Sequence, residues 1–140
     1  MTQITSNFKL SEFTHSNTAI ARKIDNIPDE YAVNNINNLV NYLLQPLRDI
    51  YNKPMGVNSG YRSKELNKAV GGVSTSQHLV GKASDIRCKN PLELLRTLIQ
   101  SSLEFDQAIL YPTFLHLSYN KGANRNQILY NKSYKGEKAW

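Results

Sequence analysis

Apolar residues recur every three or four positions along the stretch 29–51, which is the spacing of one face of an amphipathic helix. Asp29 and Glu30 stand in the first turn of this predicted helix, where the helix dipole favours acidic side chains. Pro46 lacks a backbone N–H, so we expect the helix to kink or to end near Leu44. The apolar positions that define this face are Val33, Ile36, Leu39, Val40, Leu43, Leu44, Leu47 and Ile50.

Shorter patterns predict the remaining elements. Ser63 caps a predicted helix over 64–70, and Asn90-Pro91 starts another that ends near Ser102. Residues 6–28 read as an irregular lead-in with a short helical piece. Strands are predicted over the ranges 55–61, 83–88, 105–110, 114–119 and 125–130. This order favours an α+β domain in which helices pack on one face of a central antiparallel sheet.

Composition limits the picture further. A chain of 140 residues is expected to form a single compact domain over 1–140, with a polar and loosely ordered tail over 131–140. The net charge of +6 favours attraction to anionic polymers. The basic residues are dispersed, however, so specific nucleic-acid binding is the weakest of the functional interpretations. Cys88 is the only cysteine, which excludes an intrachain disulfide and is typical of a small buried apolar residue.

The sequence predicts neither a secretory signal nor a membrane span. Residues 1–9 show neither the basic start nor the apolar run of a secretory signal, so we expect synthesis in the cytoplasm. No stretch approaches the roughly eighteen apolar residues that a membrane span needs. We also expect the domain to act as a monomer.

The candidate chemistry lies in the ten residues 76–85. His78 and Asp85 stand seven positions apart on either side of Gly81, and the chain then enters a predicted strand. Zinc takes nitrogen, sulfur and carboxylate ligands, and a catalytic zinc keeps three protein ligands and one open position. His116 is the best third ligand, because it alternates with Phe114 and Ser118 on one face of another predicted strand. If the two predicted strands lie side by side, His78, Asp85 and His116 can converge on one zinc ion.

Three more side chains are candidates for substrate contact. Arg62 follows a predicted strand, and its guanidinium group can bind a carboxylate through two parallel hydrogen bonds. Ser76 and Gln77 belong to a loop of small residues and can donate hydrogen bonds to a substrate carbonyl group. The loop lacks the Lys-Ser/Thr ending of a phosphate-binding loop.

These motifs together resemble the zinc D-Ala-D-Ala carboxypeptidases and the phage endolysins related to them. The resemblance runs from about Phe8 to Leu129 and rests on four motifs in the right order, Ser59-Gly60-Tyr61-Arg62-Ser63, Gly71-Gly72, Ser76-x-His78 with Gly81, Ala83 and Asp85, and His116-Leu117-Ser118. It implies the Hedgehog/D,D-peptidase type of fold, zinc bound by the two histidines and the aspartate, and Arg62 facing the substrate. The implied substrate is a peptidoglycan stem peptide or muropeptide. The implied place of action is the bacterial cell wall, including a role as a phage lysis or virion protein.

One part of the resemblance is missing. In many relatives a Glu, Asp or His precedes the last zinc histidine closely, but this chain has Thr113, Phe114 and Leu115 there. Asp106 is the candidate general base, because a hairpin turning at 111–113 brings it opposite Ser118 or Tyr119. The alternative hypothesis is a non-catalytic module that keeps the zinc-binding fold without turnover.

Overall fold

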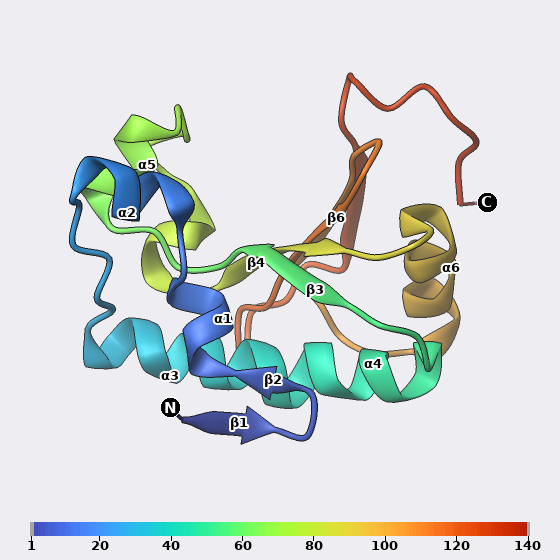
Figure 1. The fold of residues 1–140 in the computed structure, drawn as a ribbon. Coiled ribbons are helices and arrows are strands. Elements are labelled where there is room, and N and C mark those ends of the chain that lie inside the picture. The colour runs from blue at the N-terminus through green and yellow to red at the C-terminus, as the bar shows by residue number, and fades with distance from the viewer. Residues whose placement is uncertain (1, 140) are drawn as a thin grey trace.

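Residues 30–51 form one continuous helical rod in the computed structural model, which describes residues 2–139 (Figure 1). The rod consists of α3 (Glu30–Leu39), a π-helical turn η1 (Val40–Leu44) and α4 (Gln45–Tyr51). Asp29 caps it, because its carboxylate accepts a hydrogen bond from the backbone N–H of Ala32 at 2.8 Å. In place of the predicted kink or end near Leu44, the helix widens for one turn ahead of Pro46, which has no N–H to give.

The main sheet has five strands in the order β3-β4-β6-β5-β7. Their bounds are β3 (Gly56–Ser59), β4 (Ala83–Arg87), β5 (Gln107–Leu110), β6 (Leu115–Ser118) and β7 (Gln127–Tyr130). The α+β class is confirmed, but the sheet is mixed rather than wholly antiparallel, because β7 runs parallel to β5. Strand β6 already lies between β4 and β5, so β7 pairs with the free edge of β5. Because β7 turns back from β6, as β5 does, the two strands run parallel.

One face of the sheet carries the core. Ile86 of β4 and Leu115 and Leu117 of β6 are fully buried on this face. The rod and α6 (Pro91–Ser101) supply the rest of the core, and α6 contacts both α4 and the strands β5 and β6. Asn90 caps α6 as predicted, accepting a hydrogen bond from the Glu93 N–H at 3.2 Å. The fully buried leucines from these helices are Leu39, Leu43, Leu44, Leu47, Leu94, Leu95 and Leu98.

The N-terminal segment is more regular than predicted. It forms the hairpin β1 (Gln3–Thr5) and β2 (Phe8–Lys9), followed by the short helices α1 (Leu10–Thr14) and α2 (Asn17–Arg22). Gln45 of α4 holds the hairpin, because its side-chain oxygen accepts hydrogen bonds from the Thr5 hydroxyl at 2.6 Å and the Asn7 N–H at 3.1 Å. Strands of two and three residues are too short to show the alternation from which strands are predicted.

Two more short helices frame the open face of the sheet. Helix α5 (Lys64–Ala69) is capped by Ser63 as predicted, and the 3₁₀ turn η2 (Gln77–Val80) precedes β4. Figure 1 shows α5 and α2 together at one end of the molecule and α6 at the other. Helix α6 contacts the C-terminal tail, because the Arg96 guanidinium group donates a hydrogen bond to the Glu137 carboxylate at 3.0 Å.

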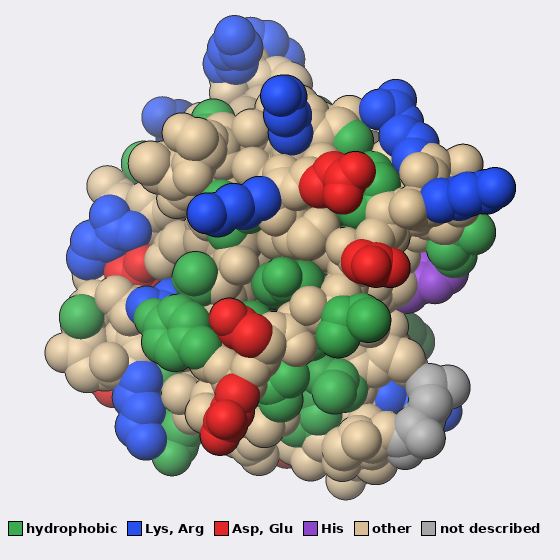
Figure 2. Space-filling view, turned by 90° about the vertical axis from the view of Figure 1, so that its left-hand side faces the viewer, with side chains coloured by type: hydrophobic (Ala, Val, Ile, Leu, Met, Phe, Trp, Pro, Cys, Tyr) green, Lys and Arg blue, Asp and Glu red, His purple; other side chains and the backbone are tan. Residues whose placement is uncertain are grey.

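Basic side chains are spread over the face of the molecule near α2 and α5 (Figure 2). Figure 2 shows Lys and Arg side chains scattered around the face near α2 and α5, with acidic side chains among them. This distribution differs from the continuous basic stripe that tracks a nucleic-acid backbone. Among the described residues, no helix combines the length and the apolar character that a membrane crossing requires.

Candidate metal centre

The register of the sheet brings two predicted ligands side by side. Asp85 of β4 pairs directly with His116 of β6, and both side chains point to the open face, away from the core. The same transverse row continues to Ser59 of β3 on one side and to Ile109 of β5 on the other. His116 Nδ1 lies 2.8 Å from Asp85 Oδ1. Directly paired residues in adjacent strands are close neighbours, so the pairing alone accounts for this contact.

The third predicted ligand, His78, comes from η2. Ser76 caps this turn by accepting a hydrogen bond from the His78 N–H at 3.2 Å, and Gly81 ends it in the left-handed conformation with φ of 76°. The carbonyl oxygen of His78 in turn accepts a hydrogen bond from the Arg62 N–H at 3.0 Å. The local structure thus holds His78 over the sheet, with its Nε2 3.4 Å from Asp85 Oδ1.

A backbone carbonyl selects which nitrogen of His78 is free. His78 Nδ1 lies 2.6 Å from the carbonyl oxygen of Gly60, a contact in which Nδ1 must carry the proton. Nε2 therefore presents its lone pair toward Asp85, as in metal sites where the second ring nitrogen donates to a carbonyl group. Gly60 is needed here, because a Cβ at this position would lie 2.7 Å from the carbonyl oxygen of Phe13.

The three side chains fit a zinc ion. One ligand atom from each of His78, Asp85 and His116 lies within 4.8 Å of the others. Zinc–nitrogen and zinc–oxygen bonds of about 2.0–2.2 Å in a tetrahedron place the ligand atoms about 3.3 Å apart. The 3.4 Å separation of His78 from Asp85 matches that spacing, and the shorter His116 contact is a hydrogen bond that a metal would replace.

The electrostatics of Asp85 favour its ionised form. Burial raises the pKa of this carboxyl group, but the neighbouring imidazoles of His116 and His78 lower it by more, so the pKa falls well below its usual range. The carboxylate is 13% exposed and the His78 side chain 4% exposed. A cleft of about 790 Å³ opens over the cluster and leaves room for water and substrate at a fourth coordination position.

Arg62 lies beside the cluster at the edge of the cleft. One terminal nitrogen of its guanidinium group is 3.7 Å from Asp85 Oδ2. Nε donates to the Ser59 hydroxyl at 3.2 Å, and Nη1 donates to the Asn67 side-chain oxygen at 3.0 Å. These contacts fix the orientation of the guanidinium group, and its side chain remains 16% exposed toward the cleft.

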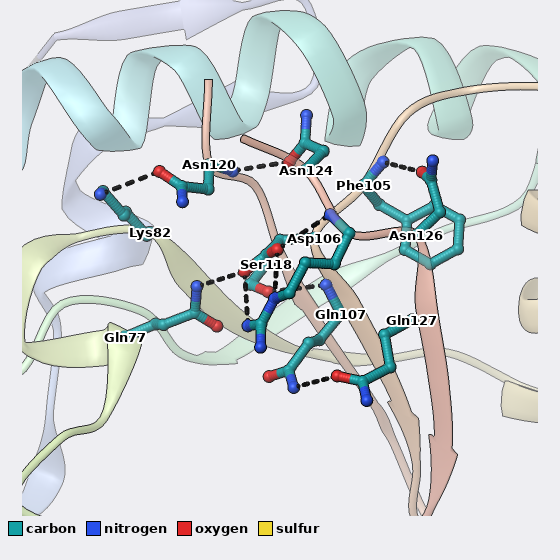
Figure 3. A network of polar contacts seen from close by, with 11 residues as sticks. Gln77, Lys82, Phe105, Asp106, Gln107, Ser118, Asn120, Asn124, Asn126 and Gln127 are labelled. Atoms are coloured by element: carbon teal, nitrogen blue, oxygen red, sulfur yellow. Dashed lines mark hydrogen bonds and ion pairs between the residues drawn. The ribbon is translucent and has the colours of Figure 1, made fainter. Parts of the chain in front are cut away.

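Asp106 also lines the cleft but belongs to a separate network (Figure 3). Its carboxylate accepts hydrogen bonds from Gln77 Nε2 at 2.7 Å and from Arg125 Nε and Nη2 at 2.8 and 2.9 Å. Asp106 is almost fully buried, at 1% exposed. The hydrogen bonds from Arg125 are the largest cause that lowers the pKa of Asp106, to about 2. Both carboxylate oxygens are therefore engaged with donors.

The loop residues predicted to bind substrate make contacts within the protein. Ser76 caps η2, and Gln77 reaches across to Asp106, although both also line the cleft. Sequence reasoning missed Arg125 and Tyr111, which line the same cleft. The alternation of Tyr111 with Ile109 could have indicated Tyr111. Arg125 follows a turn, and no periodic pattern identifies it.

A largely buried triad of two imidazoles and a carboxylate that lines an open cleft points to the class of metal-dependent hydrolases. Residues 6–118 match the family model of Peptidase M15, and the chain belongs to this family of zinc metallopeptidases. The match includes every residue of the triad. No curated protein matches the chain.

Proposed function

We propose that the chain is a zinc peptidase that hydrolyses D-Ala-containing peptide bonds of peptidoglycan, as a D,D-carboxypeptidase or as an endolysin-type endopeptidase. The single observation that carries this proposal is the meeting of His78, Asp85 and His116 within 4.8 Å at the floor of an open cleft. Family membership supports the metallopeptidase part of it. When bound there, zinc would lower the pKa of a coordinated water and polarise a peptide carbonyl group.

The substrate class is inferred from Arg62. A stem peptide that ends in D-Ala-D-Ala carries a terminal carboxylate, and a guanidinium group is a strong partner for a carboxylate. Ser59 and Asn67 already hold the guanidinium group in place, so binding a carboxylate would cost little further ordering of the side chain. A peptide anchored at Arg62 would lie with a nearby peptide bond over the ligand cluster, since Arg62 is 3.7 Å from Asp85.

The contacts of Asp106 favour a positioning role for this residue over that of general base. A base needs a free lone pair within reach of the attacking water, and its pKa should lie near the working pH. Asp106 instead has its oxygens occupied by Gln77 and Arg125 and a pKa of about 2. This observation also keeps the alternative function open, which is a zinc-binding module of the same fold without turnover.

The proposal is tested by replacing one ligand. We expect the wild-type protein to hold one zinc ion per chain and to release D-Ala or cross-link fragments from muropeptides. His78→Ala should lose most of its zinc and all cleavage, because two ligands hold zinc far more weakly than three. Zinc is measured by elemental analysis of the purified protein, and the digestion products by mass spectrometry.

His15→Ala is the matched control, because His15 lies outside the ligand cluster and its ring hydrogen-bonds to the Asn17 side chain at 3.1 Å. It should keep both zinc and activity. Stoichiometric zinc in His78→Ala would overturn the ligand assignment. Zinc-loaded wild-type protein that leaves muropeptides and a D-Ala-D-Ala peptide uncut would instead favour the non-catalytic module.

A further inference from the structure

The proposed reaction needs a hydrogen-bond donor for the negative charge that develops on the scissile carbonyl oxygen. Most polar side chains of the cleft are already engaged. Three form the candidate metal site, and Asp106 and Arg125 pair with each other at 2.8 Å. Among the described side chains that line the cleft, Tyr111 carries a phenol whose hydroxyl has no hydrogen-bond partner within the protein, whereas its backbone N–H donates to the Phe114 carbonyl oxygen at 3.0 Å.

The sheet register directs Tyr111 toward the ligand cluster. Ile109 pairs directly with His116, and Tyr111 lies two residues further along the same strand direction, so its side chain shares the open face with His116. Diagonal neighbours on one face of an antiparallel pair lie about 7–8 Å apart, which a long aromatic side chain can span.

The position of the Tyr111 ring is fixed by stacking. The ring lies against Phe114, with centroids 4.3 Å apart and planes inclined by 13°. Tyr111 is half-buried, and Phe114 also lines the cleft. A ring that is packed on one face holds its hydroxyl in place without using it, which is the preorganisation that transition-state stabilisation requires.

Arg62 and Tyr111 line the same cleft. The Arg62 guanidinium group lies on the ligand side of that cleft, 3.7 Å from Asp85 Oδ2.

We propose that Tyr111 is a catalytic residue whose hydroxyl donates a hydrogen bond to the oxyanion of the scissile peptide group; this inference rests on the proposed peptidase function. Hydrolysis consumes one water. Its oxygen bonds to the acyl carbon, the C–N bond breaks, and both water protons end on the carboxyl and amine products. Tyr111 keeps its own proton throughout and acts only through its hydrogen bond.

Tyr111→Phe tests this role, because it removes one oxygen and keeps the ring that stacks on Phe114. We expect kcat on a D-Ala-D-Ala peptide to fall by about 10²–10³-fold, the usual effect of losing one oxyanion donor. The KM should change less than threefold, and the zinc content should stay at one ion per chain. Binding of a phosphinate analogue, whose tetrahedral centre imitates the transition state, should weaken at least tenfold when measured by calorimetry.

Tyr42→Phe is the control, since Tyr42 is 48% exposed on the rod and does not line the cleft. It should match the wild type in all four measurements. Equal phosphinate affinity in Tyr111→Phe and the wild type would overturn the role of Tyr111, and so would a kcat within threefold of wild type. If the wild type cleaves no peptide, the proposed function fails, and phosphinate binding still decides whether Tyr111 contacts a tetrahedral oxyanion.

Discussion

At the scale of single residues, neighbouring groups set the state of the predicted ligands. The Gly60 carbonyl oxygen accepts a hydrogen bond from His78 Nδ1 and leaves Nε2 for a metal. The neighbouring imidazoles of His116 and His78 favour the ionised form of the Asp85 carboxyl group against the cost of its burial. Asp106 is a second buried carboxylate, but its partners are Arg125 and Gln77, so its effect should fall on stability and on the position of η2.

Asp106→Asn should lower the free energy of unfolding by about 1–2 kcal/mol at pH 7, an estimate reduced because solvent screens the exposed Arg125 partner. The folded-state pKa of about 2 lies below the unfolded value of about 3.9, so the charged form contributes stability above pH 4. That contribution disappears as the pH falls toward 2. Urea unfolding of variant and wild type at several pH values measures the difference.

Glu104→Gln is the control for Asp106→Asn, because Glu104 is an exposed carboxylate only two residues away. It should leave the free energy of unfolding within about 0.5 kcal/mol of the wild type at every pH, as surface substitutions usually do. A destabilisation of Asp106→Asn that stays constant down to pH 2 would show that the charge of Asp106 is not its cause.

At the scale of elements, the short turn η2 is the part of the site that depends most on its surroundings. A 3₁₀ turn of four residues has little stability of its own. It is held by the Ser76 cap, by the contact of Gln77 with Asp106, and by its packing on α3 and β4. The packing of η2 on α3 requires Gly81, because a Cβ at this position would lie 2.5 Å from the carbonyl oxygen of Ala32.

Gly81→Ala should therefore destabilise the protein by about 2–3 kcal/mol, since it combines backbone strain at a positive φ with a steric clash against α3. Zinc affinity should fall as well, because the shift of η2 moves His78. Gly122→Ala separates the two causes. Gly122 also has a positive φ, of 81°, but no atom lies within 4 Å of its added Cβ.

We expect Gly122→Ala to cost only about 1 kcal/mol, the strain of the backbone alone, and to leave zinc binding unchanged. Thermal unfolding and zinc titration of both variants provide the comparison. Equal destabilisation by the two substitutions would remove the packing of η2 on α3 as the reason for Gly81.

At the scale of the whole molecule, the candidate metal site joins the segment 78–85 to His116, which lies 31 positions beyond Asp85. His78 lies on η2, while Asp85 and His116 lie on neighbouring strands. An ion that binds all three binds the folded chain and not the unfolded one, so it should stabilise the whole domain.

Zinc should raise the Tm in a concentration-dependent manner and add about 2.7 kcal/mol at one hundred times its dissociation constant. His116→Ala should show little or no rise. Magnesium serves as the control ion, because it prefers six oxygen ligands to a site with two imidazoles. Thermal unfolding of metal-free protein over a zinc series measures the effect, and identical curves with and without zinc would contradict a structural link between the ion and the fold.

The periodic segments of the fold were predictable, and the unusual ones were not. The rod, α5 and α6 follow from apolar spacing and from caps at Asp29, Ser63 and Asn90, all of which are local interactions. The parallel pairing of β7 with β5, and the contact of Gln45 with the β1–β2 hairpin, join residues that are far apart in sequence. Local patterns carry no information about such contacts.

The sequence by itself determined the helical rod, the α+β class and the identity of three side chains with zinc-binding chemistry, because periodicity, capping and ligand preference are properties of residue types in order. Only the tertiary structure decided that Asp85 pairs with His116, that His78 turns its Nε2 toward them, and that Asp106 pairs with Arg125. It also decided that Tyr111 shares their face of the sheet. The reason is physical, since strand register and side-chain protonation are set by neighbours that the fold brings together from distant parts of the chain.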